Sequence, residues 1–157
     1  MYENQPDTRP NTALDDPRLY SGVLTSRVVA SAIDLGVITF LTFIVYLLIA
    51  VLGIVTFGLS WLAFFLPIVP IIAIAYVALT VGSPAQATYG MRIAGVRLVR
   101  LDGRRVDAAY GALHSLLFWF SVTVLSPFVL LIGLFTGKRQ LGHDLLLNTA
   151  MVRTNRL

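Results

Sequence analysis

The sequence predicts an all-α integral membrane protein with a small cytosolic β-hairpin. Of its 157 residues, 57% are hydrophobic and only 13% are charged, whereas soluble domains carry about 25% charged residues. No charged residue occurs from Leu35 to Met91, and arginines gather between the apolar runs. We therefore expect one membrane domain at about 20–153, between a disordered cytosolic tail at 1–19 and a short tail at 154–157.

A first transmembrane helix is predicted at about 27–52. A bilayer core about 30 Å thick requires about 20 apolar residues in a helix, and this run is long enough. Arg27 stands at its beginning, and Asp34 follows roughly 10 Å further along the helix axis. Arg27, Ser31 and Asp34 share one helix face. Because an ionisable residue inside a membrane is costly, Arg27 and Asp34 are candidate functional residues.

A second helix is predicted at about 59–81, after a turn marked by Gly53 and Gly58. Pro67 and Pro70 lie within this helix and lack the backbone N–H that a regular helix uses. The sequence therefore predicts a kink at this point.

The charged stretch that follows predicts a short interfacial helix and then a β-hairpin at about 95–107. Val96 and Leu98 alternate with arginines, as in a half-buried strand, and Asp102-Gly103 is typical of a type I′ turn. Residues 150–152 are a further candidate strand, which we expect to lie beside the hairpin.

The arginines of this loop orient the chain in the membrane. Under the positive-inside rule they place the loop in the cytosol and, by alternation, the N-terminus as well. We expect a multi-pass protein of a bacterial inner membrane. The same side chains are candidate contacts to anionic lipid headgroups, and membrane tethering favours lipid over nucleic acid as their partner. They are Arg92, Arg97, Arg100, Arg104 and Arg105.

The third apolar stretch, from Ala108 to Gly137, permits two interpretations. It is longer than one span needs and shorter than two full spans, with Pro127 in its middle. Two short helices at about 108–125 and 127–137 would return the basic C-terminal residues to the cytosol. A single span would leave them outside, against the positive-inside rule, so we favour two helices.

Three segments together resemble the RDD family of small membrane proteins, which is named for one arginine and two aspartates. These are YSGVLTSRVVASAID with Arg27 and Asp34, TYGMRIAGVRLVRLDG, and LGHDLLLNTAMV with Asp144. Met91 stands where the family often has lysine, and Asn148 where glycine is usual. The resemblance implies a multi-pass membrane domain and a suspected transport role, without a general biochemical activity.

Two roles are open for Arg27, Asp34 and Asp144. In the first, the arginine joins both carboxylates in a buried ion-pair latch that holds the first helix to the C-terminal segment. In the second, Asp34 is a cation or proton site and Arg27 changes partners. Transport by so short a chain would require a homo-oligomer, whereas the latch suits a non-transporting scaffold or accessory protein.

The sequence predicts neither an enzyme nor a cofactor or metal site. His143-Asp144 has two residue types that bind metals, but no third ligand lies nearby in the sequence. His114, at the start of the third apolar stretch, is interpreted as an interfacial side chain rather than a proton relay.

Overall fold

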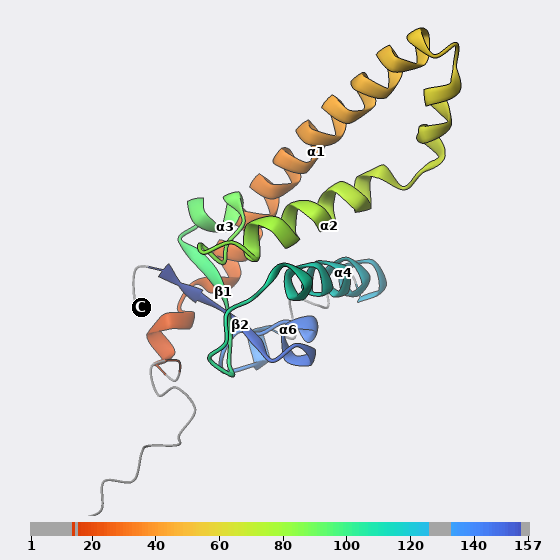
Figure 1. Ribbon diagram of the computed structural model, residues 1–157. Coiled ribbons are helices and arrows are strands. Elements are labelled where there is room, and N and C mark those ends of the chain that lie inside the picture. The colour runs from red at the N-terminus through yellow and green to blue at the C-terminus, as the bar shows by residue number, and fades with distance from the viewer. Residues whose placement is uncertain (1–13, 15, 126–132, 155–157) are drawn as a thin grey trace, which may run out of the picture.

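A single long helix dominates the structure. The computed structural model describes Leu14, residues 16–125 and residues 133–154. Helix α1, Val23–Val55, extends away from a body formed by short helices and two strands (Figure 1). It includes the predicted 27–52 and runs one turn further at its N-terminal end. It is long and apolar enough to cross a membrane, and only 17% of its most apolar window is buried within the chain.

The second apolar segment is bent, as Pro67 and Pro70 predict. A 3₁₀ helix, η3 (Leu59–Phe65), and helix α2 (Ile68–Val81) meet at 74°. Pro70 falls in the first turn of α2, where a missing N–H breaks no helical hydrogen bond. If the bent pair counts as one span, the described residues contain two candidate spans. The number of membrane crossings stays a prediction.

The predicted hairpin at 95–107 is wrong. Strand β1, Val96–Arg100, pairs antiparallel with β2, Thr149–Arg153, so that Leu98 lies opposite Met151. The chain does turn after β1, with Gly103 at a φ of +76°, but the residues that follow lead into the next helix. The partner strand is the candidate strand near the C-terminus.

Helix α4, Ala108–Leu125, has the predicted bounds. It packs against α2 on one side and against the short helix α6, Gly142–Leu146, on another. Helix α3, Tyr89–Ile93, takes the place of the predicted interfacial helix and packs on α1. The predicted helix at 127–137 lies mostly outside the described residues.

The sheet is buried on both faces. Val96, Leu98 and Met151 pack with residues of α1 and α2, including Val23, Ala30 and Val81. The opposite face packs against a 3₁₀ helix, η2 (Pro17–Tyr20), through Leu19. The prediction of a disordered tail at 1–19 is wrong for residues 17–19, because they belong to η2 and cover the sheet. Residues 1–13 and 15 lie outside the described part.

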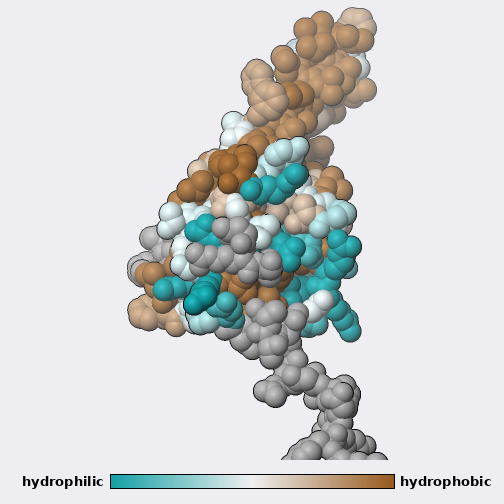
Figure 2. Space-filling view, turned by 90° about the vertical axis from the view of Figure 1, so that its left-hand side faces the viewer, coloured by the Kyte–Doolittle hydropathy of each residue, from teal (hydrophilic) through white to brown (hydrophobic). Residues whose placement is uncertain are grey.

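The surface divides into an apolar and a polar region. Figure 2 shows apolar side chains over the part that projects away from the sheet, and polar side chains gathered at the other end. Phe40, Phe43 and Leu48 of α1 are each more than half exposed. Such a continuous apolar surface is typical of contact with lipid or protein.

Candidate functional site

Asp34 lies where α1, α2 and α3 meet. One carboxylate oxygen, Oδ1, accepts hydrogen bonds from the Tyr76 hydroxyl (2.7 Å) and the Gly90 amide (2.8 Å). The other, Oδ2, accepts a hydrogen bond from the Thr88 hydroxyl (2.5 Å). All three donors are neutral. In the part of the chain that the structure describes, no arginine, lysine or histidine pairs with this carboxylate.

The local structure of α3 brings two of these donors, Thr88 and Gly90, to Asp34. Thr88 is the N-cap of α3 and its hydroxyl also accepts the Met91 amide, as N-cap residues commonly do. Gly90 lets the helix approach α1 closely, since a Cβ there would lie 2.1 Å from the carbonyl oxygen of Ala30. The first turn of α3 thus supplies two of the hydrogen bonds that Asp34 accepts.

Arg27 and Asp144 form a buried ion pair. Arg27 Nη2 lies 2.6 Å from Asp144 Oδ2, with side-chain exposures of 6% and 0%. The backbone amide of Leu141 donates to the same oxygen at 3.0 Å. The pair joins the beginning of α1 to α6, two elements that are far apart in the sequence.

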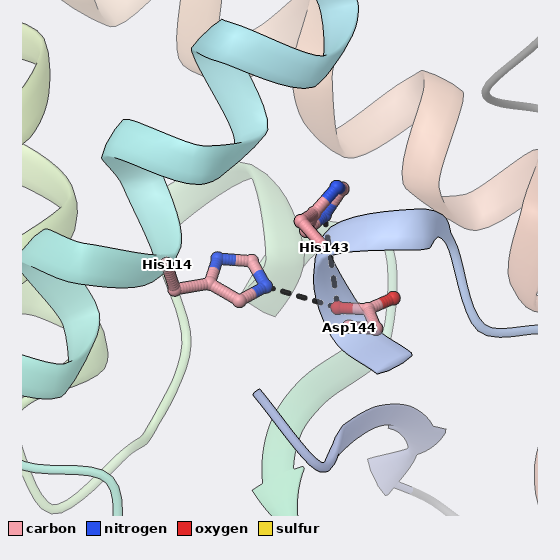
Figure 3. A group of neighbouring side chains, drawn as sticks. All are labelled: His114, His143 and Asp144. Atoms are coloured by element: carbon pink, nitrogen blue, oxygen red, sulfur yellow. Dashed lines mark hydrogen bonds and ion pairs between the residues drawn. The ribbon is translucent and has the colours of Figure 1, made fainter. Parts of the chain in front are cut away.

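Two histidines surround the other oxygen of Asp144 (Figure 3). His114 Nε2, from α4, lies 3.0 Å from Oδ1, and His143 Nε2, from α6, lies 3.7 Å from it. Both histidines are buried. Ser121 lies 3.1 Å from the Nδ1 atom of His143. The structure thus supplies a third potential metal ligand, His114, that is distant from His143-Asp144 in the sequence.

Burial and neighbouring charge set the ionisation of this cluster. Burial alone would raise the pKa of Asp144, but the Arg27 guanidinium, together with His114, holds that pKa below its usual range. Burial lowers the pKa of His143 to about 4, so its imidazole is neutral near pH 7. The pair formed by Asp144 and Arg27 is therefore ionised and has no net charge.

A cavity of about 510 Å³ connects the surroundings of the two aspartates. Its walls come from α1, α2, α3, α4 and α6 and are mostly apolar. Asp34, Arg27, His114 and His143 provide charged or polar groups on these walls. The chain therefore has a space of small-molecule size beside both groups of polar side chains.

The predicted charged residues are only partly brought together. Arg27 lies on Asp144, as a latch requires, but no ion pair joins Arg27 to Asp34 among the described residues. Burial of His114 contradicts its interpretation as an interfacial side chain. The sequence has a capping signal at Thr88, but nothing in it indicates that Tyr76, Gly90 or His114 would reach an aspartate.

The five loop arginines divide into two groups. Arg100 pairs with Asp102 and stacks 4.2 Å from the ring centroid of Tyr110, and Arg97 is part-buried in β1. Arg92, Arg104 and Arg105 are exposed. These three remain the candidates for contact with lipid headgroups.

Comparison with known proteins identifies the family. No curated protein and no solved structure matches the chain. The model of the RDD family matches residues 22–148, a range that includes Arg27, Asp34 and Asp144. The match covers most of the chain and agrees with the long apolar helix. The chain is therefore a membrane protein that belongs to the RDD family.

Proposed function

We propose that this protein is a subunit of a cation transporter that couples cation movement to proton movement through Asp34. One observation carries the proposal: Asp34 is an acidic side chain on the wall of a cavity, held by three neutral donors and by no cationic side chain among the described residues. An ionised carboxylate without a cation is costly in a membrane domain. A proton or a bound cation removes that cost.

We propose different roles for Asp34 and Asp144, because the two carboxylates have different partners. The charge of Asp144 is already offset by Arg27 at 2.6 Å, so exchange of a proton for a metal cation there would break a buried ion pair. Asp34 has no such pair to break. We assign coupling to Asp34 and assembly of the domain to Arg27 and Asp144.

The membrane arrangement belongs to the same proposal. We infer a multi-pass protein of a bacterial inner membrane with both termini in the cytosol, since this places the loop arginines inside. A chain of this size requires a second copy to form gates on both sides of a site, so we expect a homo-oligomer.

Substitution of Asp34 tests the transport role. In proteoliposomes, we expect the native chain to exchange Na⁺ or K⁺ for protons and Asp34→Asn to abolish this exchange, because Asn carries no titratable proton. Asp102→Asn is the matched control, since Asp102 lies in an exposed turn; it should retain exchange. Exchange that persists in Asp34→Asn would contradict the proposal.

A non-transporting scaffold is the second candidate function, and the Arg27–Asp144 pair favours it. That pair joins α1 to α6 whether or not anything is transported. Absence of exchange by folded native oligomers, at the same protein level, would support this candidate and exclude a coupling role for Asp34.

The exposed arginines are proposed to bind anionic lipid. Each is expected to contribute roughly 1 kcal/mol near an anionic leaflet. We expect the Arg92→Gln, Arg104→Gln and Arg105→Gln triple variant to retain less phosphatidylglycerol after purification, measured by native mass spectrometry. Arg100→Gln should retain as much as the native chain, because Arg100 is already engaged by Asp102 and Tyr110. Equal retention by all three proteins would exclude these contacts.

A further inference from the structure

We propose that His114, His143 and Asp144 bind one divalent first-row transition metal ion, such as Zn²⁺, between α4 and α6. The proposal does not rest on transport, because none of these residues contacts Asp34 in the described hydrogen bonds and ion pairs.

The positions of the three ligand atoms fit a metal ion. One ring nitrogen of each histidine and one carboxylate oxygen of Asp144 lie within 4.8 Å of one another. Asp144 Oδ1 is 3.0 Å from His114 Nε2 and 3.7 Å from His143 Nε2. Metal bonds of about 2.0–2.2 Å to such ligands place ligand atoms roughly 3–3.5 Å apart. Figure 3 shows both imidazoles beside the same carboxylate. Small side-chain movements are enough to close the site.

The hydrogen bonds of His143 leave one nitrogen without a partner. The Ser121 hydroxyl donates a hydrogen bond to the carbonyl of Phe118 at 3.0 Å, so in its contact with His143 Nδ1 at 3.1 Å the hydroxyl oxygen is the acceptor and the ring N–H the donor. In the tautomer with its proton on Nδ1, the Nε2 atom carries a lone pair. It is buried, has no hydrogen-bond partner among the described residues, and faces Asp144 Oδ1 at 3.7 Å.

Asp144 Oδ1 accepts hydrogen bonds from His114 at 3.0 Å and from the Thr149 hydroxyl at 3.3 Å, whereas the buried His143 Nε2 beside it has no donor among the described residues. A metal ion between these atoms would satisfy that nitrogen, and the hydrogen bond to Ser121 is the kind of outer contact that orients metal-binding histidines. His114 is the third ligand, after its Nε2 proton moves to Nδ1. Two imidazoles and one carboxylate select borderline transition metals over Na⁺ or Ca²⁺.

Arg27 weakens the site without occupying it. Its guanidinium lies on Oδ2 of Asp144, while the histidines lie on Oδ1. The carboxylate therefore can bind both, but part of its charge is already offset, and we expect moderate affinity. The cavity lined by both histidines leaves room for water as a further ligand.

Cobalt binding provides a direct test, because Co²⁺ reports its ligands through visible absorption. The chain contains only two histidines and no cysteine, so it must be purified without a histidine tag. In detergent, we expect the native chain to bind one Co²⁺ per chain and Zn²⁺ to displace it. A folded native chain that shows no such absorption would overturn the proposal.

Three variants locate the site. His143→Gln is expected to weaken binding by about 100-fold, and His114→Gln with His143→Gln to abolish it. Ser121→Ala keeps every ligand and should weaken binding by about 10-fold, since it frees the orientation of His143. Asp107→Asn, an exposed acid, should bind as the native chain does. Unchanged binding by the double histidine variant would place the metal elsewhere and overturn the assignment. Because no ion gradient is used, the result is independent of cation exchange.

Discussion

Arg27→Gln is expected to lower the free energy of unfolding by about 3 kcal/mol or more. The substitution leaves Asp144 fully buried and without the cation that lies 2.6 Å away in the native chain. The remaining partners of that carboxylate are the Leu141 amide, the Thr149 hydroxyl and His114, and they do not replace the guanidinium charge of Arg27. Denaturant unfolding in detergent micelles, followed by tryptophan fluorescence, measures the loss.

The reciprocal variant separates charge from packing. Asp144→Asn leaves Arg27 unpaired and should destabilise the chain by a similar amount, whereas the two substitutions together remove both charges and should recover part of the loss. Arg104→Gln is the matched control, since Arg104 is exposed and its loss should change stability by less than about 0.5 kcal/mol. Additive losses in the double variant would show that the pair is not coupled.

Gly90→Ala is expected to separate α3 from α1. The added Cβ would lie 2.1 Å from the carbonyl oxygen of Ala30 and 2.8 Å from the Asp34 carboxylate. The carbonyl of Ala30 is part of the backbone of the long helix α1 and cannot move aside. We therefore expect α3 to shift and the Gly90–Asp34 hydrogen bond to break. We expect a loss of about 3 kcal/mol, typical of severe overpacking, and an increase in the protease sensitivity of residues 83–95.

Gly36→Ala is the control for this substitution. Gly36 lies on α1, two residues after Asp34, and a Cβ there meets no atom within 4 Å. Alanine is the better helix former by about 0.5–1 kcal/mol, so this variant should be as stable as the native chain or more so. Equal effects of the two substitutions would show that α3 does not depend on close contact at Gly90.

Local patterns predicted the helices well and the long-range pairing poorly. The absence of charge from Leu35 to Met91 and the two prolines predicted α1 and the bend before α2, because these features act within a few residues. The turn signal at Asp102-Gly103 was also local, and a turn is present. Its prediction of a hairpin was wrong because β1 pairs with β2 from near the C-terminal end, and residues 104–107, which follow the turn, form no strand.

In the candidate site, too, the local features were predicted from the sequence and the contacts between distant elements were not. Arg27 and Asp34 share a helix face, which made a joint role plausible, but their partners come from different elements. Asp34 meets Thr88 and Gly90 because α3 packs on α1, and His114 meets Asp144 because α4 packs on α6. No periodicity or spacing in one sequence reports which helices pack together.

The order in which a ribosome makes the chain gives the Arg27–Asp144 pair a consequence for biogenesis. Arg27 is synthesised with the first apolar segment, whereas Asp144 is synthesised only after the third. Throughout that interval the arginine has no carboxylate from α6, and an unpaired charge at the membrane is costly. The ion pair can therefore form only after α6 has been synthesised, and until then no carboxylate of α6 offsets the charge of Arg27.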